Sequence, residues 1–253
     1  MIQALSRFAL ALQMALLMAC SVVLSPALHA ADYTIGVEAL DYYPHYRSDE
    51  SGEFSGYARA VFDAYGKDRG HSFSYRPLPV TRLYAELVGG KVDFKYPDNA
   101  FWGKEAKKGV ELGYSQPVAN YVDGLMVATG RAKDQPVKTI GTVMGFTAFA
   151  YLNDIEAGRY KVEERTSMDQ LLKGVTLGRI DAAYVNIDVA RHALKGSEDA
   201  DKLQFAEHLP ADRGSYHLST LKHAELIKDF DAWMAANADK VSALKREYSL
   251  EGN

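Results

Sequence analysis

Polar and aromatic side chains suited to binding a small molecule come directly after strands that the sequence predicts. In the first half of the chain they are Tyr42, Tyr43, Tyr96, Asp98 and Asn99, and in the second half Gly145, Phe146, Thr147, Asn186 and Asp188. In open parallel sheets, ligands bind beyond the carboxyl ends of the strands. Tyrosine offers a ring face and a hydroxyl that donates or accepts a hydrogen bond. The pattern therefore predicts a binding site between two sheet edges.

Two further residues near these strand ends add a charge and an aromatic face. Arg82, in the segment Pro79-Val-Thr-Arg82, begins a predicted helix and is the best cation for an acidic group of a ligand, although a salt bridge within the protein is an equal alternative. Trp102 is either a ligand contact or a packing residue. Gly145 is expected to open a helix, whose free backbone N–H groups would favour an anionic ligand group.

The residues of common catalytic motifs do not occur in this sequence. It contains no Gly-x-Ser-x-Gly, no phosphate-binding glycine-rich loop and no His-Glu-x-x-His. His45 is the histidine nearest the predicted site, and with Asp41 it would still lack the further ligands that a metal needs. We therefore expect no catalytic residue, no metal and no cofactor. An enzyme would need a carboxylate for acid–base chemistry, for which Asp98 or Asp188 would serve.

The elements that position these residues alternate between strand and helix, which indicates an α/β fold with mostly parallel strands. Strands are expected over 33–38, 72–76, 92–96, 121–128, 137–143, 160–164, 180–185 and 216–220. Helices are expected over 56–70, 80–88, 146–156 and 168–177, followed by a long helical segment near the end of the chain. The four-residue spacing of Tyr57, Val61 and Tyr65 places the two tyrosines in the core, as the final apolar stripe does for Trp233.

A weak internal repeat indicates two similar halves. Leu87-Val-Gly-Gly-Lys-Val-Asp93 is echoed by Thr176-Leu-Gly-Arg-Ile-Asp181, so that a helix ends at glycine and an apolar residue and an aspartate follow. A single copy would be ordinary helix-to-strand turn chemistry. Two copies at matching points of two α/β halves favour two similar lobes.

The first thirty residues have the three parts of a secretory signal. Arg7 is followed by an apolar run and then by a small-residue exit, with cleavage expected near Ala30. Lipid anchoring at Cys20 is the less favoured alternative. Because Cys20 is the one cysteine of the chain, the exported protein would carry neither a disulfide nor a thiol. The formal net charge of −4 argues against a nucleic-acid partner.

Several short segments, in this order and spacing, resemble the bacterial extracellular solute-binding proteins of family 3, which have the periplasmic-binding-protein-like type II fold. These segments are Phe54-x-Gly56-Tyr57, residues 87–93, Tyr114-Ser-Gln-Pro-Val118, residues 140–147, residues 177–182 and Leu244-Lys-Arg-Glu-Tyr248. The resemblance covers the chain after the signal. It implies two α/β lobes joined by two crossing strands, with lobe 1 formed by residues 31–125 and 213–253 and lobe 2 by residues 126–212.

The resemblance also implies a function. A periplasmic, monomeric binding protein would close its lobes on a small polar metabolite, amino-acid-like or an organic acid, and deliver it to the permease of an ABC-type importer in the inner membrane. The alternatives are a receptor that passes the ligand signal to a sensor protein and, less favoured, an enzyme similar to cyclohexadienyl dehydratases.

The chain departs from the amino-acid-binding members of the family at the ligand clamp. Those members typically carry an arginine where this sequence has only Lys104, Lys107 and Lys108, and an aspartate where it has Asn186. A guanidinium fork and a lysine point charge bind a carboxylate differently. Nine of the 16 tyrosines fall between Tyr33 and Tyr96. The sequence therefore favours a ligand held by aromatic faces and hydroxyls.

Overall fold

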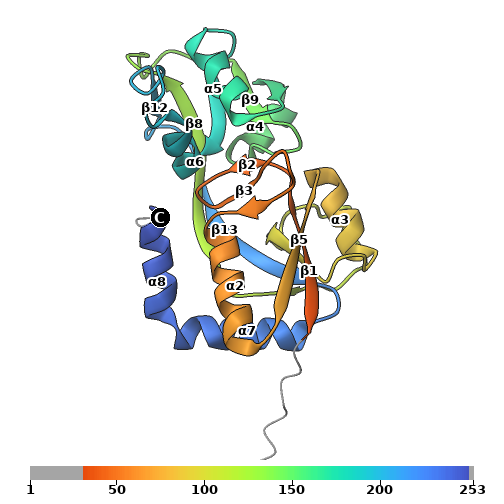
Figure 1. Cartoon of the computed structure of the whole chain (residues 1–253). Helices are drawn as coiled ribbons and strands as arrows, with labels where there is room; N and C mark the ends of the chain where they lie inside the picture. Colours follow the sequence, from red (N-terminus) through yellow and green to blue (C-terminus); the bar gives the residue numbers. More distant parts are fainter. Residues whose placement is uncertain (1–30, 251–253) are drawn as a thin grey trace, which may run out of the picture. The chain divides into compact units, whose positions relative to one another are not determined.

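The computed structural model describes residues 31–250, so the predicted signal, its cleavage near Ala30 and Cys20 lie outside the described residues. The described residues belong to one compact unit. Its centre is a ten-stranded mixed sheet (Figure 1), in which eight strands follow the order β10-β9-β11-β8-β13-β6-β1-β5 and β12 and β7 pair at its sides. Within residues 31–250, no helix combines the length and hydrophobicity that crossing a membrane requires.

The first group of strands is parallel and carries two helices. The strands are β1 (Asp32–Glu38), β5 (Ser72–Leu78) and β6 (Phe94–Asp98), and the helices are α2 (Tyr57–Arg69) and α3 (Val80–Val88). Strand β1 pairs with both of its neighbours in parallel. Tyr57 and Tyr65 are buried on α2, which confirms the core face predicted from their spacing.

The second group repeats this arrangement. Its parallel strands are β9 (Thr139–Val143), β10 (Lys161–Arg165) and β11 (Ala182–Asn186), with helices α5 (Met168–Thr176) and α6 (Ile187–Leu194). The repeated aspartates have the same structural role in both groups. Asp93 accepts the backbone N–H of Thr34, and Asp181 accepts those of Lys138 and Thr139. Each aspartate thus ties the turn after a helix to the start of a neighbouring strand.

Two long antiparallel strands link the groups into one sheet. They are β8 (Ala119–Ala128) and β13 (Asp212–Thr220), which pair with one another from Asp212 opposite Asp123 to Tyr216 opposite Ala119. Strand β8 continues beside β11, and β13 continues beside β6. Because β8 and β13 are hydrogen-bonded to each other, the two predicted sheets form a single continuous sheet. The short strands β7 (Gly113–Tyr114) and β12 (Leu203–Phe205) pair with β13 and β8.

The long C-terminal helical segment consists of two helices, α7 (Ala224–Ala236) and α8 (Ala238–Glu247), which Asn237 separates. Trp233 on α7 is fully buried, as its place in the apolar stripe predicts. Its indole N–H donates to Asp68 on α2 at 2.9 Å. The end of the chain is therefore packed against the first group of strands and helices, far from it in sequence.

A small three-stranded sheet lies between β1 and α2 in the chain. It consists of β2 (Asp41–Tyr42), β3 (Tyr46–Ser48) and β4 (Phe54–Ser55). Gly56 then precedes α2 with φ of 101°, and a Cβ at this position would lie 2.8 Å from the Cα of Tyr46. Only glycine fits this left-handed and crowded position, so Gly56 lets α2 begin directly behind the small sheet.

The predicted helix over 146–156 is wrong in its first part. A 3₁₀ turn covers Phe149–Tyr151 and α4 covers Leu152–Glu156, whereas residues 144–148 form a loop. Gly145 has φ of 85°, and its N–H donates to Glu164 Oε1 at 3.1 Å. Gly145 therefore does not open a helix, and its N–H already has an acceptor.

Candidate ligand-binding site

A cavity of about 200 Å³ lies where the ends of the first strand group, the loop over residues 144–148 and strands β8, β11 and β13 converge. This equals the volume of about seven water molecules at 30 Å³ each, which suits a small metabolite. The residues that line it are Glu38, Tyr42, Tyr46, Val80, Tyr84, Pro97, Trp102, Gly103, Asp123, Gly145, Phe146, Thr147, Phe149, Tyr184, Val185 and Tyr216.

Aromatic rings form the walls, some stacked and some at steep angles to one another. Tyr42 stacks on Tyr46 at 5.2 Å between ring centroids, and Phe146 meets Tyr42 edge-on at 5.4 Å. Trp102 meets Tyr216 at 5.9 Å with an interplanar angle of 63°. Such perpendicular pairs are a preferred aromatic geometry. The walls therefore present ring faces in several directions.

Glu38 provides a carboxylate at the end of β1. Its side chain is 4% exposed and accepts a short hydrogen bond from the Tyr46 hydroxyl. Burial raises the pKa of Glu38, and the positive charge of Lys95 and the Tyr46 hydroxyl oppose that rise. An acid that ends a buried strand is thus held at the cavity wall by a tyrosine of the small sheet.

Asp123 provides a second carboxylate, on β8. Burial raises the pKa of Asp123 to about 7; the Asn186 side chain lowers it, while Asp212 and Asp188 add to the rise. One carboxylate oxygen, Oδ1, is buried without a hydrogen-bond partner. A buried acceptor without a partner is costly, so this oxygen is a natural contact point for a donor on a ligand.

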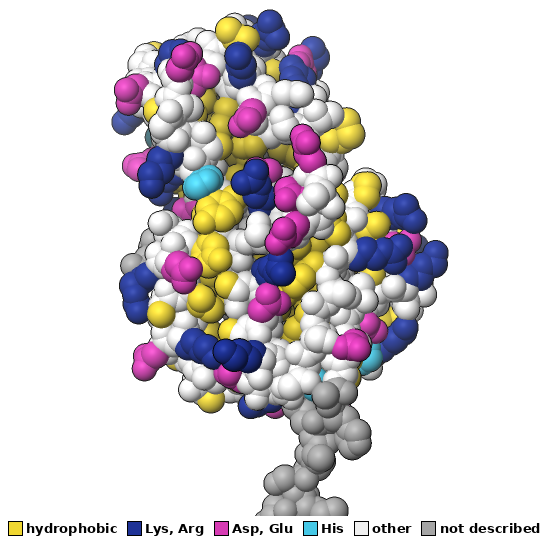
Figure 2. All heavy atoms as spheres, in the orientation of Figure 1, with side chains coloured by type: hydrophobic (Ala, Val, Ile, Leu, Met, Phe, Trp, Pro, Cys, Tyr) yellow, Lys and Arg dark blue, Asp and Glu magenta, His cyan; other side chains and the backbone are white. Residues whose placement is uncertain are grey.

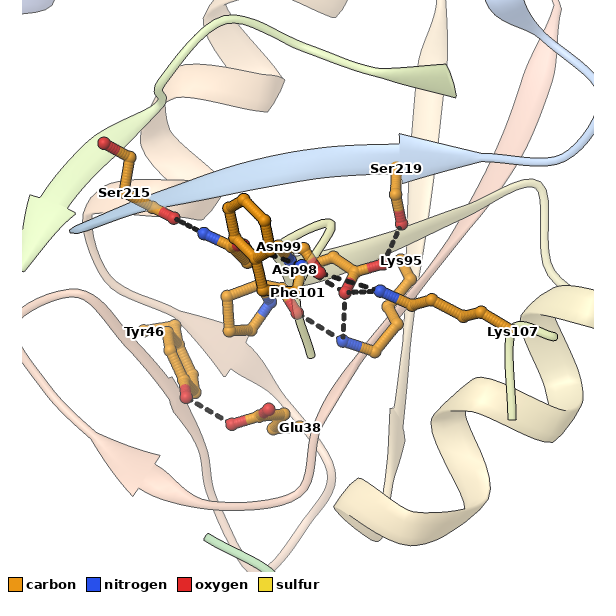
Figure 3. A network of polar contacts seen from close by, with 10 residues as sticks. Glu38, Tyr46, Lys95, Asp98, Asn99, Phe101, Lys107, Ser215 and Ser219 are labelled. Atoms are coloured by element: carbon orange, nitrogen blue, oxygen red, sulfur yellow. Dashed lines mark hydrogen bonds and ion pairs between the residues drawn. The ribbon is translucent and has the colours of Figure 1, made fainter. Parts of the chain in front are cut away.

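Asp98 and Asn99, both predicted site residues, belong to a polar network beside the cavity (Figure 3). Asp98 accepts from Lys107 Nζ at 2.7 Å and from Ser219 Oγ at 2.6 Å, and Lys95 Nζ lies 3.6 Å away. Asn99 donates to the carbonyl of Ser215 at 3.1 Å. Figure 3 shows both ammonium groups directed at Asp98. This network joins β6 to β13.

Five of the predicted residues lie in the cavity lining, namely Tyr42, Trp102, Gly145, Phe146 and Thr147. Tyr96 is fully buried next to the cavity, edge-on to Tyr46 at 6.2 Å and to Tyr216 at 6.4 Å. Its hydroxyl is buried without a hydrogen-bond partner. That these residues contact a ligand remains a prediction.

Arg82 lies outside the cavity lining. It is exposed, and its Nε lies 3.3 Å from Glu86 Oε1. Arg76 and Lys91 also approach the buried Glu86, at 3.2 and 3.9 Å. This arrangement corresponds to the salt-bridge alternative for Arg82.

Asn186 and Asp188 lie at the start of α6, outside the cavity lining. The Asn186 side chain accepts the N–H groups of Asp188 and Val189 and so caps the helix. Its amide nitrogen lies 3.3 Å from the Tyr216 hydroxyl. Asp188 Oδ2 lies 3.6 Å from Nε2 of the fully buried His45, which links α6 to the segment between β2 and β3.

Tyr43 lines a second hollow, outside the cavity. Its ring lies 4.4 Å from that of His192 on α6, and the hollow continues along β2, the start of α5 and α6. Figure 2 shows apolar side chains among acidic and basic ones on the face of the molecule that Figure 1 presents. Tyr43 therefore packs between segments that are distant in sequence and lies apart from Trp102 and Phe146.

The two carboxylates of the cavity and five of its rings are not among the residues predicted from the sequence: Glu38, Asp123, Tyr46, Tyr84, Phe149, Tyr184 and Tyr216. A signal was present for the acids. Glu38 ends an apolar strand, and Asp123 interrupts the apolar run over 121–128. An ionisable residue within a buried strand is unusual and marks a polar contact. In residues 31–250, no group of His, Cys, Asp and Glu side chains is arranged to hold a metal ion.

No model of a known protein family matches the sequence, and no curated protein matches it. Solved structures do match. An arginine transport system periplasmic binding protein from Legionella pneumophila gives a TM-score of 0.67 at 16% identity, over 87% of this chain and 100% of that chain. A periplasmic His/Glu/Gln/Arg/opine family-binding protein from Silicibacter pomeroyi, in complex with lysine, gives 0.68 at 18% identity, over 87% and 97%.

A histidine kinase sensor domain with similarity to periplasmic binding proteins also matches, with a TM-score of 0.68 at 16% identity over 86% of this chain and 95% of that chain. At these identities the comparisons show the fold alone. The chain thus has the mixed α/β fold of the two-lobed periplasmic binding proteins, as predicted. The fold occurs both in binding proteins and in a sensor domain, which leaves the function to be argued from the site.

Proposed function

We propose that this protein is a periplasmic solute-binding protein that holds a small polar metabolite in the aromatic cavity. The observation that carries the proposal is the cavity itself, in which eight aromatic side chains and two carboxylates from both strand groups surround about 200 Å³. Ligand sites are typically concave and apolar, with a few polar groups that fix orientation. The fold shared with periplasmic binding proteins supports the same conclusion.

The protein would act by closing residues 126–212 onto residues 31–125 and 213–253 around the ligand. Because β8 and β13 run between the two strand groups, they are the natural hinge. Ligand contacts from both groups would stabilise the closed form over the open form, which is a population shift. A closed protein would then be recognised by its partner in the inner membrane.

The partner would be the permease of an ABC-type importer. The sensor domain among the structural matches supports one alternative, in which the same closure is read by a sensor protein. The two versions share the ligand site and differ in what binds the closed form. Pull-down of the liganded protein with candidate permease and sensor proteins would distinguish them.

A thermal-shift screen of the purified protein against a few hundred small metabolites tests the proposal. Ligand at 100 times its dissociation constant stabilises the folded state by about 2.7 kcal/mol, which is a shift of about 5–10 °C for a protein of this size. We expect at least one small polar compound to produce such a shift. No shift from any compound in the library would contradict the proposal.

Two neighbouring aromatic residues localise the binding. Trp102 lines the cavity, whereas the Phe101 side chain is 72% exposed and does not. Trp102→Ala should abolish the ligand-induced shift, and Phe101→Ala should leave it intact. Equal loss in both variants would show that binding depends on the loop and not on the cavity.

The enzyme alternative has its own readout. Formation of a product while the protein is incubated with a compound from the screen would favour the dehydratase-like enzyme.

A further inference from the structure

We propose that the ligand is an organic ammonium ion without a carboxylate, held by ring faces and by hydrogen bonds to Asp123 and Glu38. This inference rests on the proposed function, because it assigns a ligand class to the same cavity. It differs from the amino-acid-like or organic-acid ligand that the family resemblance implies. The charges, the rings and the unpartnered carboxylate oxygen carry it.

The charges around the cavity are unbalanced toward the negative. The lining holds Glu38 and Asp123 but no lysine, arginine or histidine among the described residues. The ammonium groups of Lys95 and Lys107 lie 4.5 and 5.2 Å from the centroid of the Tyr84 ring, and Asp98 engages both, as Figure 3 shows. A ligand carboxylate would therefore enter a site with two acids and no free cation, where like charges repel and desolvation is uncompensated.

The basic side chains on and beside helix α3 are also engaged. Arg82, Arg76 and Lys91 all approach Glu86, which is 4% exposed. Moving any of them into the cavity would leave Glu86 less compensated, which is costly for a buried carboxylate. None of these three side chains is therefore spare to replace the arginine clamp that the sequence lacks.

The rings provide what an ammonium ion needs. Tyr42, Phe146, Trp102 and Tyr216 line the cavity in two steeply angled pairs. A cation over the face of a Trp, Tyr or Phe ring gains about 0.5–2 kcal/mol, more when it is desolvated. Lys95 already illustrates this interaction at the cavity edge, because its Nζ lies 4.5 Å from the centroid of the Tyr84 ring.

Asp123 supplies the directed contact. Its Oδ1 is buried without a partner, so an N–H of a protonated amine would satisfy an acceptor that the protein leaves open. Primary and secondary ammonium groups can make this bond, whereas a quaternary ammonium cannot. The site therefore favours an amine with N–H groups over a fully methylated one.

Proton linkage gives the site a characteristic pH dependence. The titratable groups that surround Asp123, from β2, β8, β11, α6 and β13, are Tyr42, Tyr121, Tyr184, Asp188, Asp212 and Tyr216, with His45 beyond Asp188. The pKa of Asp123 is raised to about 7, first by burial. A ligand that binds only the ionised carboxylate then binds about 30-fold more weakly at pH 5.5 than at pH 8. Aliphatic amines stay protonated over this range.

Matched pairs of an amino acid and its decarboxylated amine test the inference. The probes are agmatine against arginine, cadaverine against lysine and tyramine against tyrosine, measured by thermal shift and then by calorimetry at pH 8. We expect at least one amine to bind, at least 30-fold more tightly than its amino acid, and to lose about 30-fold in affinity at pH 5.5. An amino acid that binds as tightly as its amine would overturn the inference.

A variant pair localises the effect at Asp123. Asp123→Asn should weaken amine binding at least tenfold and remove most of the pH dependence. The control is Asp231→Asn, because burial also raises the pKa of Asp231 but its side chain accepts the backbone N–H of Gln116, outside the cavity lining. If Asp123→Asn does not fold, the pH dependence of the wild-type protein decides by itself.

The outcomes separate this inference from the proposed function. If the metabolite screen finds an organic acid, a neutral compound or an amino acid, and Trp102→Ala abolishes its binding, the inference fails and the proposed function stands. If no compound from the screen or the amine panel binds, both fail. Amine binding that persists in Trp102→Ala and Asp123→Asn would also overturn the inference.

Discussion

At the scale of single residues, Asp123 is the feature whose energetics are easiest to isolate. Burial raises the pKa of this carboxyl to about 7 in the folded protein, whereas it is near 3.9 in the unfolded chain. The folded state therefore binds the proton more tightly, and Asp123 costs stability as pH rises from about 4 through 7. A cation that binds the ionised carboxylate would offset this unfavourable free energy.

Asp123→Asn in the unliganded protein should therefore stabilise the fold in a pH-dependent way. We expect its advantage in free energy of unfolding over the wild type to grow by about 2.5 kcal/mol between pH 5 and pH 8. Urea denaturation at the two pH values measures this. A constant difference at both, or a variant that is less stable at pH 8, would show that the Asp123 carboxyl is not held in the buried, raised-pKa state.

At the scale of residues, the sequence predicts a site residue only where that residue follows the end of a predicted strand. Tyr42, Phe146 and Trp102 are predicted in this way. Glu86, the partner of Arg82, follows it by four residues on α3, so this ion pair is within reach of a local helical pattern. The partners of Asp98 are not, because tertiary packing brings Lys107 and Ser219 to it.

At the scale of elements, the turn before α2 controls how the small sheet sits on the first helix. Gly56→Ala should destabilise the protein by about 2 kcal/mol or more, since it adds a side chain at φ of 101° and places a Cβ against the Tyr46 backbone. Thermal or urea unfolding of the purified variant measures the loss.

Gly52→Ala is the matched control for this prediction. Gly52 also has a positive φ, of 82°, but a Cβ there would meet nothing within 4 Å. The control should cost about 1 kcal/mol from backbone strain alone. Equal losses in the two variants would mean that the close approach to Tyr46 contributes nothing to the stability of the fold.

The elements themselves were largely predictable, because apolar spacing and glycine stops set the bounds of α2, α3 and α5. The segment over 146–156 shows the limit. Its apolar spacing is typical of a helix, yet Gly145 takes a positive φ and Phe146 turns into the cavity wall before the helix begins. Tertiary contacts at the cavity thus override the local preference.

At the scale of the whole molecule, the proposed function requires that ligand binding draw the two strand groups together. Small-angle scattering should show a smaller radius of gyration on addition of a saturating ligand found in the screen. An unchanged radius with a confirmed ligand would contradict the hinge role proposed for β8 and β13, while leaving the cavity as the ligand site.

The central claim, that the ligand occupies the aromatic cavity, is tested most directly by tryptophan fluorescence. The chain has two tryptophans; Trp102 lines the cavity, and Trp233 is fully buried in the core. Titration of the wild type with ligand should change the emission with the affinity that calorimetry gives. In Trp102→Phe this change should vanish although calorimetry still detects binding. An emission change that survives in Trp102→Phe would report on Trp233 instead, and would contradict a ligand in the cavity.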